Sequence, residues 1–177
     1  LGQWGAAAAW YGLHAHLFLG GRAALGSLAQ VRAQLREVRP ASVDPASIAH
    51  PAGALASATY SIAKLAPWWE RRQLLDEALR HLDVPPGRPR EESVHAALRG
   101  SIWLRRGHPW RAVEHYRAAL RLRESLGESP ARIGESLSEL GFACLFTGRF
   151  GAGRDLMQRG IDMLASGEVG FLIRAKK

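Results

Sequence analysis

Histidine and cysteine side chains are the first candidates for chemistry in this sequence of 177 residues. His14 and His16 stand two residues apart, and imidazole pairs are common zinc ligands. On a helix this separation places the two side chains about 200° apart around the axis, so they cannot share a metal ion. Cys144 is the only cysteine, which excludes an intramolecular disulfide and a zinc site built on paired cysteines. We expect a buried, unreactive thiol, because no general base lies at a supportive spacing.

A glycine-rich stretch and two acidic pairs are the other candidates for a reactive site. Residues 148–153 resemble a phosphate-binding loop, but the lysine and Ser/Thr that end such loops are missing and no strand is predicted before them. The pairs Asp76-Glu77 and Glu91-Glu92 are adjacent in sequence, so their members point to different sides of a helix and form no acid–base pair. The sequence therefore predicts no catalytic residue, no cofactor and no metal ion, as in a protein that is not an enzyme.

The elements that carry these residues are predicted to be helices. No segment alternates apolar and polar residues as a half-buried strand does, and glycine and proline divide the chain into helix-length pieces. Pro67, Pro89, Pro109 and Pro130 mark helix starts, where a first-turn amide needs no partner within the helix. A further helix is expected to begin near Phe171. The other expected helices span 4–18, 22–38, 45–65, 67–83, 90–105, 109–126, 130–147 and 150–165.

Small and large residues recur along the chain with a period of about 41 residues, as in helical repeat proteins. Glycine or alanine at a helix crossing lets two backbones approach, and a large residue one turn away fills the groove beside it. Such hairpins bury their apolar faces by stacking on their neighbours. The expected units are 4–38, 45–83, 90–126 and 130–165. Pairs that lie one period apart include Gly100 and Gly141, Gly107 and Gly148, Ala112 and Gly153, Tyr116 and Met157, and Ala119 and Gly160.

The segment Leu137-Ser-Glu-Leu-Gly-Phe-Ala-Cys-Leu-Phe-Thr-Gly-Arg-Phe-Gly-Ala-Gly-Arg-Asp-Leu-Met carries this pattern best. It resembles the tetratricopeptide repeat, a pair of antiparallel helices with small and large residues at these positions. Units longer than the usual repeat of this family, as here, are similar to those of large bacterial signal-transducing regulators. The resemblance implies an all-α fold, a right-handed α-solenoid of about four antiparallel helical hairpins, in one domain cut from a longer protein.

In this family, ligands usually lie in the concave groove lined by the first helix of each hairpin. The resemblance implies a non-enzymatic interaction or scaffold module that binds a peptide, a helix or a neighbouring domain there. A carboxylate clamp is disfavoured, because the chain contains no asparagine. Carried onto this sequence, the concave face comprises Trp10, Tyr60, Lys64, Ser101, Arg105, Glu135, Phe142 and Phe146. For Trp10, Tyr60 and Phe142, packing between adjacent hairpins is the alternative.

Two other functions remain open. A sensory domain of a bacterial ATPase or transcription regulator could relay the binding of a small molecule through the array. Nucleic-acid binding is the other, because the formal net charge is +8 and arginines gather over residues 99–123. The alternative for these arginines is a set of solvated helix faces. They are Arg99, Arg105, Arg106, Arg111, Arg117, Arg121 and Arg123.

The start of the chain and a tryptophan pair complete the predictions. Residues 1–21 contain no Lys, Arg, Asp or Glu, but Gln3, His14 and His16 interrupt the apolar run, so no membrane span is expected. The lone cysteine favours the cytoplasm. Without an obvious polar cap, the N-terminal end is expected to self-associate or to meet an upstream contact.

At least one indole of Trp68-Trp69 is expected to cover a hairpin junction or to meet a partner.

Overall fold

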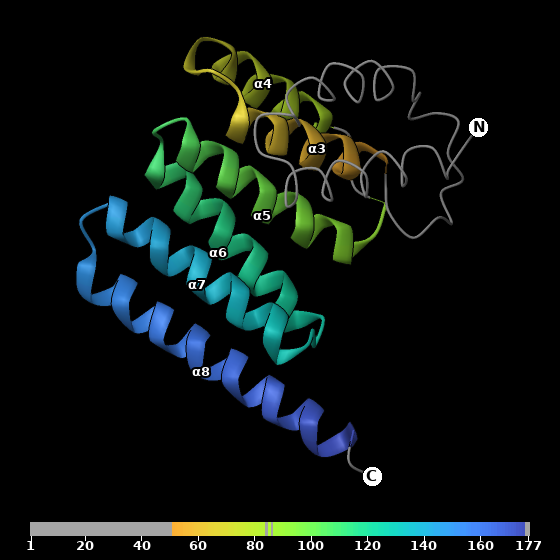
Figure 1. Ribbon diagram of the computed structural model, residues 1–177, viewed down its shortest axis with the longest axis vertical. Coiled ribbons are helices and arrows are strands. Elements are labelled where there is room, and N and C mark those ends of the chain that lie inside the picture. The colour runs from red at the N-terminus through yellow and green to blue at the C-terminus, as the bar shows by residue number, and fades with distance from the viewer. Residues whose placement is uncertain (1–50, 84, 86, 176–177) are drawn as a thin grey trace. The chain divides into compact units, whose positions relative to one another are not determined.

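The computed structural model describes residues 51–83, 85 and 87–175, and within these it contains helices and no strand (Figure 1). The prediction of an all-α fold is therefore confirmed for the described part of the chain. The expected first unit, residues 4–38, lies outside the described residues. The helices are α3 (Pro51–Leu65), α4 (Trp68–His81), α5 (Pro89–Arg105), α6 (Pro109–Ser125), α7 (Pro130–Phe146) and α8 (Phe150–Ala175).

Helix starts follow the prolines closely. Pro89, Pro109 and Pro130 are the first residues of α5, α6 and α7. Pro67 instead precedes α4 as its N-cap, one residue earlier than the helix itself. The fixed φ angle of proline suits a helix, and an amide in the first turn would have no hydrogen-bond partner within the helix. Proline is therefore favoured at these starting positions.

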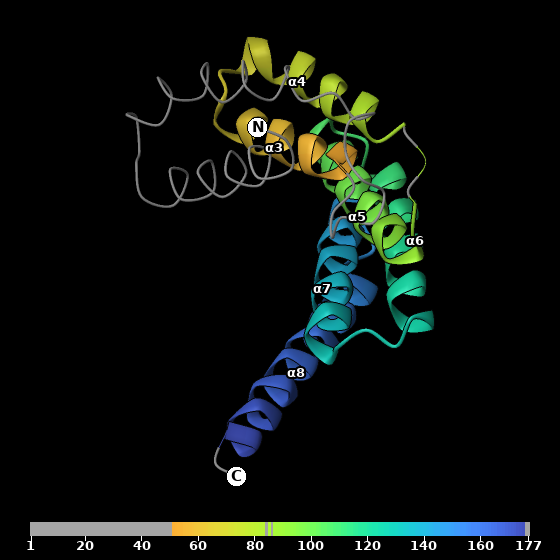
Figure 2. The same cartoon turned by 90° about the vertical axis from the view of Figure 1, so that its right-hand side faces the viewer.

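The chain divides into two compact units, with the boundary between Gly87 and Arg88. In the first unit α3 packs against α4. In the second unit α5 packs against α6, α6 against α7, and α7 against α8. Figure 2 shows α5 and α7 on the same side of α6. Consecutive helices thus pack on one another within each unit, as expected for helical hairpins.

The two hairpin crossings of the second unit lie one repeat period apart, as the sequence predicts. A Cβ atom added to Gly100 would lie 2.8 Å from the Tyr116 ring, and one added to Gly141 would lie 2.7 Å from Met157. At Gly141 the backbone carbonyl of Gly153 is equally close, at 2.7 Å. The small and large positions therefore meet across both hairpins, and the smallest side chain allows the helices to approach.

The turns inside the two hairpins repeat as well. Gly107 and Gly148 have φ angles of +79° and +77°, which favour glycine. Just after each glycine, the amide of His108 donates to the carbonyl oxygen of Trp103 at 2.9 Å, and that of Arg149 donates to Cys144 at 3.0 Å. This pattern is typical of a helix that ends on a left-handed glycine.

One core joins the four helices of the second unit. Its fully buried members lie on α6 and α7, and half-buried side chains of α5 and α8 pack against them. Cys144 is buried in this core, as predicted. The buried members are Ala112, Val113, Tyr116, Leu120, Leu137, Leu140, Ala143 and Cys144.

The C-terminal end differs from the prediction. We expected a helix to end at residue 165 and another to begin near Phe171, but α8 runs without a break from Phe150 to Ala175. A helical glycine costs only about 1 kcal/mol relative to alanine, and no proline enforces an end here.

Candidate functional site

Five of the eight residues expected to line a binding surface lie on α5 and α7. Ser101 and Arg105 are on α5, and Glu135, Phe142 and Phe146 are on α7. Ser101 and Phe142 occupy equivalent positions of successive repeats, as do Arg105 and Phe146. Because the two hairpins share this register, the two pairs hold equivalent positions in their helices. The hairpins thus place a polar pair on α5 and an aromatic pair at the matching position on α7.

The aromatic pair on α7 is open to solvent. Phe142 and Phe146 are 47% and 60% exposed. Their ring centroids lie 5.1 Å apart with the planes at 73°, an edge-to-face contact between side chains one helical turn apart. Phe142 is therefore about half exposed, and its packing between hairpins stays the alternative to a partner contact. Two adjacent exposed rings form an apolar element that a partner can cover.

The polar pair on α5 divides into one outward and one inward group. The Arg105 side chain is exposed at the last residue of the helix. The Ser101 hydroxyl lies 2.9 Å from the Tyr116 hydroxyl and donates to the carbonyl oxygen of Ala97 at 3.3 Å. Ser101 therefore links α5 to α6, and the charged side of this surface comes from Arg105.

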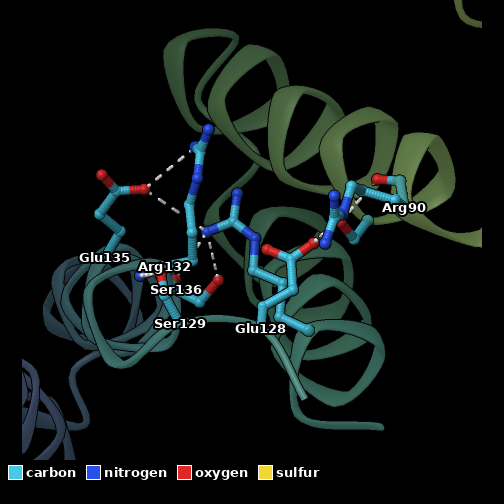
Figure 3. A network of polar contacts seen from close by, with 8 residues as sticks. Arg90, Glu128, Ser129, Arg132, Glu135 and Ser136 are labelled. Carbon is cyan, nitrogen blue, oxygen red and sulfur yellow. Dashed lines mark hydrogen bonds and ion pairs between the residues drawn. The ribbon is translucent and has the colours of Figure 1, made fainter. Parts of the chain in front are cut away.

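Glu135 belongs to a different cluster from the phenylalanines. Eleven residues of helix separate it from Phe146, about 16 Å at the usual rise. Its carboxylate lies 3.4 Å from the Arg132 guanidinium and 3.8 Å from that of Arg123 (Figure 3). Glu135 is thus part of the polar junction where α6 meets α7.

A buried arginine organises this junction. Arg123 is 5% exposed, and its Nη1 donates to the carbonyl oxygen of Arg132 at 2.9 Å and to the Ser136 hydroxyl at 2.8 Å. Its Nε is buried and makes no hydrogen bond. Figure 3 shows the residues of α7 that contribute to this network. A buried guanidinium needs such partners, because the loss of its hydration is costly.

Glu139 adds a buried carboxyl to the same junction. Burial raises its pKa to about 7, and repulsion from Glu135 adds to this effect, while Arg123 and Arg132 oppose it. Its Oε2 atom is buried and makes no hydrogen bond. This carboxyl therefore titrates close to neutral pH.

The sequence holds a signal for the junction that our predictions missed. Positions 82, 123 and 164 follow one another at the repeat period and hold Leu82, Arg123 and Leu164. Leu82 is fully buried. An arginine at an apolar position of the repeat indicates a buried polar contact.

A second unpredicted feature is a set of arginines stacked on indole rings beside the hairpin turns. Trp103 packs on the core, and the guanidinium groups of Arg106 and Arg111 lie 4.8 and 4.6 Å from the centroid of its ring. At the second turn, the Arg149 guanidinium lies 4.9 Å from the centroid of the ring of Trp110, which follows the first turn. These distances are typical of cation–π contacts. Arginine spacing alone did not indicate them, and the contact between Arg149 and Trp110 also depends on how the two turns face each other.

The remaining predicted residues lie elsewhere. In the first unit, the Lys64 ammonium is 5.5 Å from the centroid of the Tyr60 ring, and Trp10 lies outside the described residues. Trp68 and Trp69 are both mostly exposed and contact each other edge to face, with ring centroids 5.8 Å apart. Neither indole is buried in a core, so a partner contact for this pair stays a prediction.

Metal ligation and membrane insertion have no candidate among the described residues. Within them, no three side chains of His, Cys, Asp or Glu come together as metal ligands. None of the described helices combines the length and the apolar character that crossing a bilayer requires.

No protein-family model matches the chain, and no curated protein matches it significantly. The resemblance to tetratricopeptide repeats therefore depends on the residues, the register and the helix pairing described above.

Proposed function

We propose that the chain is a non-enzymatic protein interaction module of the tetratricopeptide type, a right-handed solenoid of hairpins. The concave face formed by the first helix of each hairpin binds a peptide, a helix or a neighbouring domain. The observation that carries this proposal is the exposed pair Phe142 and Phe146 on α7.

The chemistry of this face indicates the kind of segment it binds. Two rings one turn apart fit the apolar side of an amphipathic helix, whose own anchors recur every three or four residues. Aromatic anchors of this kind commonly dominate binding energy at interfaces. Arg105, at the position of α5 equivalent to Phe146, supplies a positive charge. An amphipathic segment with an acidic edge is the complementary partner.

The test uses the full chain as bait in extracts of its native host. A photo-crosslinking amino acid placed at position 146 identifies the proteins that contact this face, and each recovered protein is then titrated directly. The double variant Arg105→Glu/Phe142→Ala is expected to weaken binding at least tenfold with unchanged helicity, because it removes one anchor and reverses the charge. The proposal fails if the recovered partners bind this variant as tightly as the wild type.

The matched control is Ile161→Ala. Ile161 is an exposed apolar residue on α8, the second helix of its hairpin, and is not a member of the proposed face. Its truncation removes a comparable apolar surface and is expected to leave partner binding unchanged. An equal loss in this control would show that general surface hydrophobicity, and not the concave face, holds the partner.

A further inference from the structure

The hairpin turns of the second unit carry a surface that the proposed interaction does not use. We call it the arginine–indole surface and define it by Trp103, Arg106, Trp110, Arg111, Arg149 and Phe150. It comes from both hairpins, because the Arg149 guanidinium beside the second turn lies over the ring of Trp110, which follows the first turn.

Positive charge gathers at this surface. Three of its six residues are arginines, Arg106, Arg111 and Arg149, and none is acidic. The nearest acids in the sequence are Glu114 and Asp155, and Asp155 is paired with Arg154, with 3.8 Å between Oδ1 and Nε. A net positive cluster of this kind attracts polyanions over a distance set by the salt concentration.

Stacking on the indole rings also fixes the orientation of the guanidinium groups. A guanidinium that lies against an indole is held in place, and its N–H donors project from the edge of its plane. Such donors match the paired oxygens of a phosphate. Arg106 and Arg111 on Trp103, and Arg149 on Trp110, are placed in this way.

Exposed flat rings lie among these arginines. Trp110 is 55% exposed and Phe150, which follows Arg149 in sequence, is 68% exposed. The surface therefore offers both flat aromatic rings and guanidinium groups. A single nucleic-acid strand offers the complementary pair, because each nucleotide has a base that can stack and a phosphate that can pair.

We propose that the arginine–indole surface binds single-stranded nucleic acid. A duplex fits less well, because its bases are stacked inside and cannot reach the rings. An acidic peptide can pair with the arginines, but its carboxylates have no π-face to place on Trp110 and Phe150. This inference does not depend on the concave-face interaction, which uses a different surface.

The test measures fluorescence anisotropy of labelled 20-nucleotide oligothymidylate and oligouridylate with the full 177-residue chain. Binding is expected at 50 mM NaCl. With three phosphate contacts, the affinity for a single strand should fall about 20-fold between 50 and 200 mM NaCl. The thymidylate and uridylate strands distinguish DNA from RNA preference, and binding of either one supports the proposal.

Two sets of variants locate the site. Arg111→Glu/Arg149→Glu is expected to weaken binding at least tenfold, and Trp110→Leu, which keeps an apolar side chain, about fivefold or more. Arg121→Glu/Arg159→Glu makes the same change in net charge at two exposed arginines outside the surface and should weaken binding less than threefold. Circular dichroism checks that each variant is folded, and Arg111→Gln/Arg149→Gln is the milder substitute if the glutamates unfold the chain.

Four results would overturn the proposal. The first is that neither strand binds at 50 mM NaCl. The second is that Arg111→Glu/Arg149→Glu and Arg121→Glu/Arg159→Glu weaken binding equally. The third is that polyglutamate binds more tightly than the strands and its binding depends on Arg111 and Arg149 in the same way. The fourth is equal affinity for a 20-base-pair duplex with no effect of Trp110→Leu, since stacking would then contribute nothing.

Discussion

Gly141 and Gly151 show how differently two helical glycines can be placed. A Cβ atom at Gly141 would meet the Gly153 carbonyl oxygen at 2.7 Å, whereas one at Gly151 would meet nothing within 4 Å. Gly141→Ala is therefore expected to destabilise the chain by about 2 kcal/mol or more, because a backbone atom cannot move aside. Gly151→Ala should stabilise it by up to about 1 kcal/mol through helix propensity.

Urea unfolding followed by circular dichroism measures both changes. Both substitutions replace glycine by alanine. Opposite signs of the change in the free energy of unfolding would therefore separate the effect of helix contact from that of helix propensity. A stabilising Gly141→Ala would show that α7 and α8 are not in backbone contact at this crossing.

Glu139 makes stability depend on pH near neutrality. Its pKa is raised to about 7 in the folded chain, mainly by burial, whereas an unfolded glutamate titrates at about 4.5. Between these values the folded state keeps a proton that the unfolded chain has lost. The free energy of unfolding therefore falls as the pH rises through this window, by up to about 3 kcal/mol in total.

The measurement compares urea unfolding of the wild type and Glu139→Gln at pH 5 and pH 8. Glutamine cannot lose a proton, so this contribution should vanish in the variant. Burial lowers the pKa of His81 and His115, which gives the opposite slope but is common to both proteins. An identical pH dependence in the two proteins would mean that Glu139 is solvated when folded.

At the scale of elements, the helices were largely predictable and their side-chain pairings were not. Prolines and turn glycines are local signals, and they placed the starts of α5, α6 and α7 within one residue. The repeat register placed Gly100 and Gly141, and likewise Tyr116 and Met157, at equivalent positions, whereas the approach of each glycine to its large partner is seen only in the structure. The stacking of Arg149 on Trp110 depends on the approach of two turns from different hairpins, and no local pattern encodes that approach.

The wrong prediction at the C-terminus leads to a test of α8. If residues 166–171 continue the helix, Gly167→Ala/Gly170→Ala should raise helicity and thermal stability, because alanine favours the helical backbone. Circular dichroism at 222 nm and a thermal melt report both quantities. A loss of stability in this variant would show that one of the glycines forms a turn.

At the scale of the whole molecule, the second unit contains a core of its own. Side chains of α5, α6, α7 and α8 pack around one cluster, and each helix of the unit packs on the next. A fragment of residues 88–177 is therefore expected to fold without the first unit. It should show helical circular dichroism and a single cooperative transition in urea. A non-cooperative, gradual loss of signal would contradict this prediction.

Arg123 has a consequence for building longer arrays from this chain. If the α5–α6 hairpin were duplicated in tandem, its buried guanidinium would face the positions equivalent to Glu135, Ser136 and Glu139 in the preceding repeat, which hold Val94, His95 and Leu98. Both carboxylates and the serine hydroxyl would be lost, and an unpaired buried charge costs several kcal/mol. The hairpins are therefore not interchangeable modules: one arginine specifies which hairpin must follow which.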